Sequence, residues 1–197
     1  MNIKKGVKIF SLVVMVLLLA LGCGRNAEKN KGSSYKKPSK NVETDAIIGN
    51  DETLARIYSG IKESYDDNYL PVTKNNQAMI EENYGISPLW YHAAVVETAA
   101  VNAQPDMLMG FLVKEEYKEQ LLLKVTEYRT ALLDNAPPDP VNAAKIQASQ
   151  ILVYDEHIFF IMLGIVDDAK QDAVILKDSF AKENQKAIKV IEQYLGE

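Results

Sequence analysis

Three side chains in this 197-residue sequence are suited to nucleophilic or acid–base chemistry near neutral pH: Cys23, His92 and His157. A thiolate is a nucleophile and a metal ligand, and a histidine exchanges protons near pH 7. Neither histidine lies in an H-x-x-x-H or H-x-H spacing, so the three or four ligands of a zinc ion do not assemble from them. We therefore predict no metal site and no cofactor, and we expect both histidines at the beginnings of strands.

Short motifs of common catalytic sites are missing from the sequence. It contains no G-x-S-x-G nucleophile elbow, no phosphate-binding P-loop and no G-x-G-x-x-G dinucleotide fingerprint. Acidic pairs occur at 66–67 and 167–168, where we interpret them as signals that end one element and begin a turn. No carboxylate pair stands out for glycosidase chemistry. The sequence therefore predicts no catalytic residue.

Two groups of side chains are candidates for binding a ligand. Tyr69, Trp90 and Tyr91 lie in or beside predicted loops, where aromatic rings can form a stacking surface for sugars or for a partner's side chains. The alternative is that these rings pack short helices onto a sheet. Gln147 and Gln150 are polar residues within a predicted strand, and they either line a groove or form the solvent face of that strand.

The only cysteine stands at the end of a hydrophobic leader. Positions 4, 5 and 8 are lysines, and residues 9–21 are apolar except for one serine. A helix of this length spans about 20 Å, whereas the hydrocarbon core of a bilayer is about 30 Å thick. Residues 1–22 are therefore predicted to be a secretory signal rather than a transmembrane helix.

The residues around Cys23 resemble the lipobox of bacterial lipoproteins, in which the thiol receives a diacylglyceryl group and becomes the first residue of the mature chain. Gly22 supplies the small residue before the cleavage site, whereas Ala20 and Leu21 depart from the commonest form of the motif. The resemblance implies cleavage between Gly22 and Cys23, acyl chains such as palmitate on Cys23, and a place on the extracytoplasmic face of the cell membrane. A plain secretory signal that is cut near a cysteine is the alternative.

A polar segment separates this cysteine from the rest of the chain. Residues 23–50 show no apolar periodicity, so we predict a disordered tether with an r.m.s. reach of about 30 Å. Its net charge is +3, which suits anionic lipid headgroups. Residues 51–197 carry 13 basic and 24 acidic residues, and this acidic balance argues against nucleic-acid binding. Because they contain no cysteine, a packed core rather than disulfides must hold them together.

Residues 51–197 are predicted to form a single α+β domain with the element order α-α-β-β-α-β-β-α. Apolar spacing predicts four helices, over 53–66, 75–84, 115–133 and 172–195. Gly85 is expected to end the second of these helices. Apolar runs bounded by turn signals predict two hairpins, with strands over 91–101 and 107–114 and over 144–153 and 157–166. Together they make a four-stranded, mostly antiparallel sheet with helices packed on it. The last strand is almost continuously apolar, so we expect it to be central and covered on both faces.

Several segments of this domain are notable when they are taken together. They are Ile57-Tyr58, Ile61-Lys62, Tyr69-Leu70-Pro71, Tyr84-Gly85-Ile86, Phe111-Leu112-Val113-Lys114, Tyr128-Arg129, Lys145-Ile146-Gln147-Ala148-Ser149-Gln150 and Phe159-Phe160-Ile161-Met162-Leu163-Gly164. They resemble an uncharacterised family of short lipoproteins of Gram-positive, clostridia-like bacteria, known as a domain of unknown function. The resemblance covers about residues 53–195 and implies an anchored single domain. It assigns no catalytic or ligand residue.

These observations lead us to expect an extracytoplasmic lipoprotein that binds or assists an envelope protein or a wall polymer. The alternative is an accessory hydrolase or transferase that acts on cell-surface polymers. Such an enzyme requires a concave pocket that holds at least two carboxyl groups with perturbed pKa values.

Overall fold

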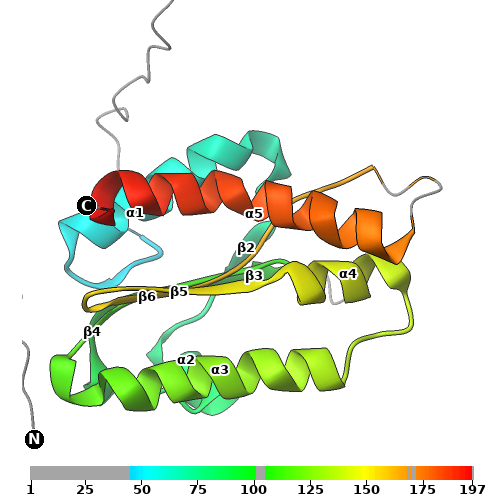
Figure 1. Cartoon of the computed structure of the whole chain (residues 1–197). Helices are drawn as coiled ribbons and strands as arrows, with labels where there is room; N and C mark the ends of the chain where they lie inside the picture. The colour runs from blue at the N-terminus through cyan, green and yellow to red at the C-terminus, as the bar shows by residue number, and fades with distance from the viewer. Residues whose placement is uncertain (1–44, 101–104, 168, 170–171, 197) are drawn as a thin grey trace, which may run out of the picture. The chain divides into compact units, whose positions relative to one another are not determined.

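An antiparallel sheet forms the centre of the computed structural model, which describes residues 45–100, 105–167, 169 and 172–196 (Figure 1). Its strands are β1 (Ile48–Gly49), β2 (Pro71–Lys74), β3 (Tyr91–Ala99), β4 (Met107–Val113), β5 (Gln150–Tyr154) and β6 (His157–Met162). The order across the sheet is β1-β3-β4-β6-β5, and β2 also pairs with β3. All pairings among these strands are antiparallel. The predicted antiparallel sheet is confirmed, although the described residues contribute six strands rather than four.

Helices cover both faces of this sheet. On one face lie α1 (Glu52–Tyr65) and α5 (Ala173–Leu195), and on the other lie α2 (Gln77–Tyr84) and α3 (Lys118–Asp134) (Figure 1). The shorter α4 (Pro140–Ala148) packs against α5 and directly precedes β5. The described residues also form three short 3-10 helices, namely η1 (Asp66–Asn68), η2 (Pro88–Trp90) and η3 (Glu115–Tyr117). The mixed helix and sheet class predicted from the sequence is confirmed.

Two apolar cores lie on the two faces of the sheet, because successive side chains of a strand point in opposite directions. In β6, Ile158 and Phe160 pack toward α2 and α3, whereas Phe159 and Ile161 pack toward α1 and α5. All four side chains are buried. Since β6 also lies between β4 and β5, the prediction of a central strand that is covered on both faces is confirmed.

Local sequence signals account for several helix ends. The side chain of Asp51 caps α1, and that of Asn76 caps α2, each by accepting a hydrogen bond from a backbone N–H in the first turn. Gly85 ends α2 in the left-handed conformation, with φ of 65°. This is the conformation that favours glycine after a helix, so the predicted end of α2 is confirmed.

The predicted strand over 144–153 is wrong in its first half. Residues 140–148 form α4, and β5 begins only at Gln150. Asp139 caps this helix, and Pro140 occupies its first turn, where a proline costs no hydrogen bond. Ile146 and Ala148 alternate with polar residues, as in a strand, but both are buried on one short helix. An apolar pattern of this length fits a strand and a short helix equally well.

Two short strands at the start of the fold were not predicted. Ile48 and Gly49 of β1 pair with β3, and Ala46 is buried, although the prediction placed all three residues in the tether. The folded domain therefore begins before residue 51. Strands of two and four residues, such as β1 and β2, carry too little periodic pattern to be recognised. The remainder of the predicted tether, residues 23–44, lies outside the described residues.

Within the described ranges, no helix is both long and apolar enough to cross a membrane. The predicted secretory signal over residues 1–22 lies outside these ranges.

Candidate functional site

Strand β5 leaves one edge of the sheet open in the part of the chain that the structure describes. It pairs with β6 on one side and ends the strand order on the other. Every second residue of an edge strand directs its backbone N–H and C=O away from the sheet. In Figure 1 this edge faces the viewer between α5 and α3. The edge therefore offers a row of unpaired backbone donors and acceptors.

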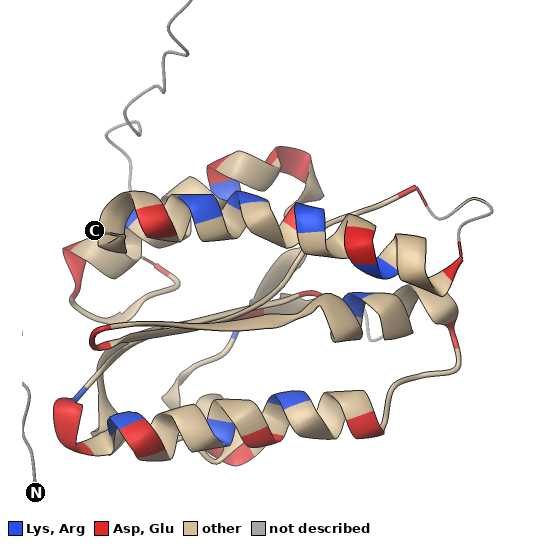
Figure 2. Cartoon of the chain, in the orientation of Figure 1, with Lys and Arg blue, Asp and Glu red and all other residues tan. Residues whose placement is uncertain are grey.

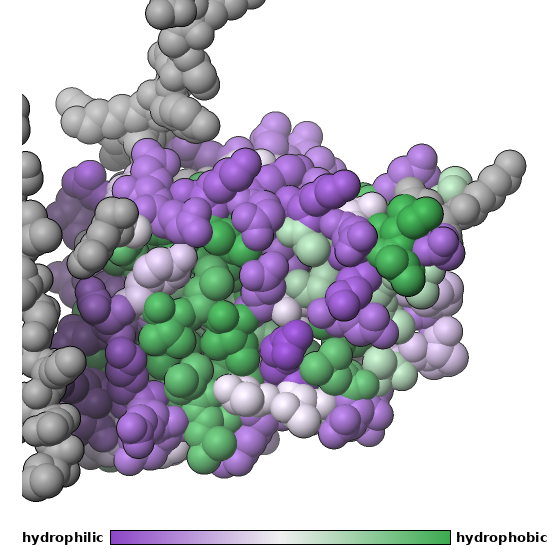
Figure 3. Space-filling model, viewed as in Figure 1, coloured by the Kyte–Doolittle hydropathy of each residue, from purple (hydrophilic) through white to green (hydrophobic). Residues whose placement is uncertain are grey.

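The side chains of β5 make this open edge apolar and free of charge. Its 5 residues read Gln-Ile-Leu-Val-Tyr, and Val153 is 41% exposed. Figure 2 shows charges on the helices around the strand, and Figure 3 shows hydrophobic side chains gathered on the same face. Exposed edges are usually protected by charged residues, proline or bulges. The opposite edge is shared by β1 and β2, of which β2 contains Pro71 and Lys74 and pairs irregularly, whereas β5 has no such protection.

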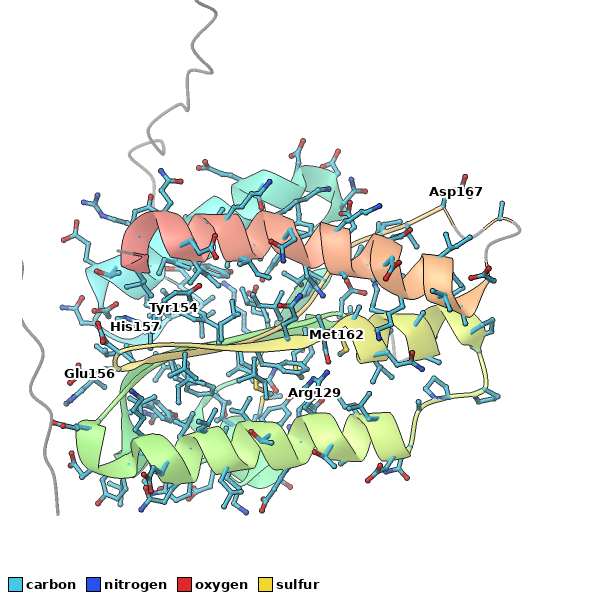
Figure 4. The ribbon with its side chains drawn as sticks, in the orientation of Figure 1. Arg129, Tyr154, Glu156, His157, Met162 and Asp167 are labelled. Atoms are coloured by element: carbon cyan, nitrogen blue, oxygen red, sulfur yellow. The ribbon has the colours of Figure 1, made fainter. Side chains whose placement is uncertain are left out.

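Arg129 lies at the beginning of β5, although it belongs to α3. Its Nε donates to the backbone oxygen of Ser149 over 3.2 Å and to the Oγ of Ser149 over 3.1 Å. Ser149 ends α4 and directly precedes β5. Among the described residues, none accepts a hydrogen bond from the two terminal guanidinium nitrogens. Arg129 thus holds a fixed positive charge with available donors at the start of the open strand (Figure 4).

A cavity of about 420 Å³ lies between α3 and α4. Apolar side chains such as Leu132 and Ile146 form much of its wall, and its polar groups come from Tyr128, Asn135 and Asn142. Burial raises the pKa of Tyr128, so that hydroxyl stays neutral at physiological pH. Because its lining residues are all uncharged, the cavity suits a neutral, mainly apolar group better than an ion.

A buried ion pair holds α4 in place. Lys145 of α4 donates to Asp106, the residue before β4, and their side chains are 7% and 0% exposed. Asp106 also accepts from the backbone N–H of Gly164 over 3.2 Å, and the Lys145 ammonium lies 5.0 Å from the ring centroid of Phe180. Burial raises the pKa of Asp106, and the neighbouring lysine offsets part of that rise. The pair connects α4 to β4, β6 and α5, and so determines where β5 begins.

Asn184 on α5 makes a second buried polar connection in this region. Its Oδ1 accepts from the backbone N–H of Leu163, and its Nδ2 donates to the backbone oxygen of Ala148, each over 2.9 Å. One side chain therefore satisfies backbone groups at the end of β6 and at the end of α4. The junction between α4 and β5 is fixed from both sides.

Glu97 is a buried carboxylate on the sheet face that α1 covers. Its two oxygens accept hydrogen bonds from the hydroxyls of Tyr58 and Tyr69, each over 2.9 Å. Burial and the adjacent carboxylate raise the pKa of Tyr69, so its hydroxyl remains a donor. The Lys62 ammonium lies 5.3 Å and 5.7 Å from the centroids of the two rings. Tyr69 therefore belongs to a buried structural network.

The three aromatic binding candidates do not share one surface. Tyr69 packs on the α1 and α5 side of the sheet, whereas Trp90 and Tyr91 pack on the α2 and α3 side. Trp90 stacks on Tyr117 with ring centroids 6.2 Å apart, and Tyr91 packs against Phe111 at 5.6 Å. Burial raises the pKa of Tyr91 to about 12. These contacts agree with the alternative in which the rings serve packing.

The remaining candidates lie in three different environments. Gln147 is exposed on α4, and Gln150 is the half-buried first residue of β5. Gln150 is therefore the candidate that lies on the open edge. Gly22 and Cys23 lie outside the described residues, so their predicted cleavage and acylation have no structural counterpart here.

The histidines occupy different positions on their strands. His92 is exposed in β3, and His157 begins β6, where it stacks on Phe159 with ring centroids 6.2 Å apart. The Nε2 of His157 lies 3.7 Å from the Oδ1 of Asp51. In the ranges that the structure covers, no three or more His, Cys, Asp and Glu side chains gather as metal ligands would.

Sequence reasoning missed four charged residues that the fold pairs or positions: Glu97, Asp106, Arg129 and Lys145. Glu97 and Lys145 each interrupt an apolar stretch, which is a signal of a buried charge that needs a partner. Asp106 directly precedes the apolar run of residues 107–113 and Arg129 lies in a mixed stretch, so neither interrupts an apolar run and nothing local distinguishes them.

The elements and contacts above define a domain in which helices cover both faces of an antiparallel sheet, and in which the edge strand β5 has no strand partner on its outer side among the described residues. The chain belongs to the family described as Domain of unknown function (DUF4358), which matches residues 63–163. This range contains the whole of β5 together with Arg129 and the Asp106–Lys145 pair. Neither the curated proteins nor the solved structures include a match to the chain.

Proposed function

We propose that the protein is a lipoprotein anchored through Cys23 on the extracytoplasmic face of the cell membrane, and that its domain binds an envelope protein by strand addition to β5. The basic and apolar leader and the lipobox-like residues at Cys23 support the anchor. The basic residues that follow favour a position next to anionic lipids.

The unpaired, uncharged edge of β5 carries the binding proposal. In strand addition, main-chain hydrogen bonds provide affinity, and alternate side chains provide specificity. Ile151 packs toward the α2 and α3 side of the sheet, and Leu152 and Tyr154 pack toward the α1 and α5 side. An added strand would therefore extend both apolar layers. A polypeptide fits this edge better than a wall glycan, because a glycan lacks regularly spaced amide groups.

Catalysis on cell-surface polymers has no comparable support in the geometry. No carboxylate lines the cavity between α3 and α4. The buried acids Glu97 and Asp106 are engaged by tyrosine hydroxyls in one case and by a lysine and a backbone N–H in the other. These acids are structural partners of neighbouring side chains, so the binding function is the one we favour.

Site-specific photo-cross-linking in intact cells tests the binding surface. A photoreactive amino acid at Val153 should capture an envelope protein. The same amino acid at Val174, a valine on α5 that is 69% exposed, is the matched control and should capture far less. Equal capture at the two positions, or no capture at Val153, would contradict binding through β5.

Fatty-acid labelling tests the anchor separately. The wild-type protein should incorporate an alkyne-labelled fatty acid in growing cells, and the Cys23→Ala variant should not, because the cysteine supplies the only thiol. Labelling of both proteins, or of neither, would refute acylation at Cys23.

A further inference from the structure

We propose that the strand added to β5 is the C-terminal segment of a partner protein, and that Arg129 binds its terminal carboxylate. This inference rests on the proposed strand addition and specifies the chemistry and direction of the partner at the same edge.

The direction of the added strand follows from the sheet. All described pairings in this sheet are antiparallel, and antiparallel pairing is slightly more stable per residue than parallel pairing. A strand that adds antiparallel to β5 runs from Tyr154 toward Gln150. Its carboxyl end therefore arrives beside Ser149, the residue to which the Nε of Arg129 is hydrogen-bonded.

Arg129 has the chemistry that a carboxylate requires. A planar guanidinium binds a carboxylate through two parallel N–H···O bonds. Its terminal nitrogens have no acceptor in the described part of the chain, while its Nε is held by two bonds to Ser149. Because the side chain is already positioned, it loses little conformational freedom when a carboxylate binds. Figure 4 shows Arg129 at this junction, away from Tyr154 and His157 at the other end of β5 and β6.

Charge at the two ends of β5 selects the same direction. Arg129 stands at the first residue of the strand, whereas the acidic residues Asp155 and Glu156 form the turn after its last residue. Figure 2 shows this acidic turn at the end of the hairpin. A terminal carboxylate is attracted at the Arg129 end and repelled at the turn. The charges therefore favour an antiparallel strand that ends at Arg129.

Binding of two synthetic peptides to the full-length protein in detergent micelles tests this proposal. Both are fluorescent peptides of alternating valine and threonine, one with a free C-terminal carboxylate and the other amidated. Fluorescence anisotropy should show that the free acid binds about tenfold more tightly, because a hydrogen bond to a charged group adds about that factor.

Three variants identify the groups involved. Arg129→Gln should reduce binding of the free acid to the level of the amide. Arg56→Gln on α1, which removes an exposed arginine paired with Glu52, is the matched control and should keep the tenfold difference. Val153→Lys places a charge on the edge strand and should weaken both peptides equally. Circular dichroism on each variant checks that the fold is intact.

Equal binding of the two peptides to the wild type, or a tenfold difference that survives Arg129→Gln, would overturn the proposal. If the peptides bind equally and Val153→Lys weakens both, strand addition stands and only the terminal carboxylate is refuted. An amidated peptide ending in glutamate that binds as tightly as the free acid would assign the carboxylate to a side chain instead. Dimers that Val153→Lys abolishes would make a second copy of the chain the occupant. If neither peptide shows saturable binding, both strand addition and the carboxylate contact fail.

Discussion

Replacing Lys145 with methionine should destabilise the protein strongly, because it leaves the carboxylate of Asp106 buried without its countercharge. The Asp106 side chain is 0% exposed. In the variant this carboxylate keeps the hydrogen bond from the backbone N–H of Gly164, at 3.2 Å, but no positive charge beside it. Methionine has nearly the length of lysine and keeps an apolar contact with Phe180, so the change removes mainly the charge.

The expected loss is about 3–5 kcal/mol of unfolding free energy, which is the usual cost of removing one member of a buried ion pair. The total unfolding free energy of a domain is about 5–15 kcal/mol, so the loss is a large part of the stability. Urea unfolding followed by far-UV circular dichroism measures it. A loss below about 1 kcal/mol would refute the reasoning, since it would mean that water already solvates the pair.

A double variant separates lost charge from lost packing. Asp106→Asn combined with Lys145→Met removes both charges, and the amide oxygen of asparagine still accepts from Gly164. We expect this variant to regain most of the stability that Lys145→Met loses, because no unpaired charge is buried. A double variant as unstable as the single one would show that packing around Lys145, and not the carboxylate, dominates.

The pH dependence of Lys145→Met provides an independent check. Burial already raises the pKa of Asp106, and the variant loses the lysine that opposes this rise, so the native pKa increases further. The native protein then binds a proton that the unfolded chain has already released. The stability of the variant relative to the wild type should therefore be greatest at low pH and should fall as the pH rises through the native pKa. A loss that is the same at every pH would contradict this assignment.

Glycine conformation and tyrosine burial give two further predictions. Gly164→Ala should lower the free energy of unfolding, measured by thermal denaturation, by about 2 kcal/mol or more. The reason is that φ of Gly164 is 111° and that the new Cβ would overlap Glu183 and lie 2.9 Å from its Cγ. Gly85→Ala, with φ of 65° and its nearest neighbour at 3.6 Å, is the matched control and should cost about 1 kcal/mol; equal losses would contradict the steric argument. Burial raises the pKa of Tyr65, Tyr69, Tyr84 and Tyr91, so their contribution to stability should be complete below about pH 10 and lost as the pH rises further. Part of the tyrosinate absorbance should then appear only together with the change in circular dichroism, and ionisation of every tyrosine with unchanged dichroism would refute the burial.

Elements with strong local periodicity could be predicted from the sequence. The stripe of apolar residues over 53–66 corresponds to α1, and the continuous apolar run after His157 corresponds to the buried strand β6. Gly85 could be predicted as a helix end because the reason is local to the backbone. By contrast, α4 was not predicted, because its short apolar pattern fits both the period of a helix and the period of a strand. Its packing against α5 decides between the two.

The candidate site could be predicted only in part. Gln150 was chosen for its polarity and does lie on the open edge, but Tyr69 and Tyr91 are aromatic residues that the fold buries. Aromatic side chains serve cores and surfaces equally well, so residue type alone does not separate the two roles. Arg129 could not be predicted as part of the site, because its position depends on a contact with Ser149, which is 20 residues away in the sequence.

By itself, the sequence determined the apolar run over residues 9–21, the acidic balance of residues 51–197 and most of the helices and strands, because charge, composition and periodicity are local properties. Only the tertiary structure decided that β5 is an edge strand and that Arg129 stands at its beginning. Periodicity shows which side of a strand is buried, but it does not show which strand lacks a neighbour. That depends on pairings between distant segments, such as β4 with β6, and on long-range contacts such as the one between Asp106 and Lys145.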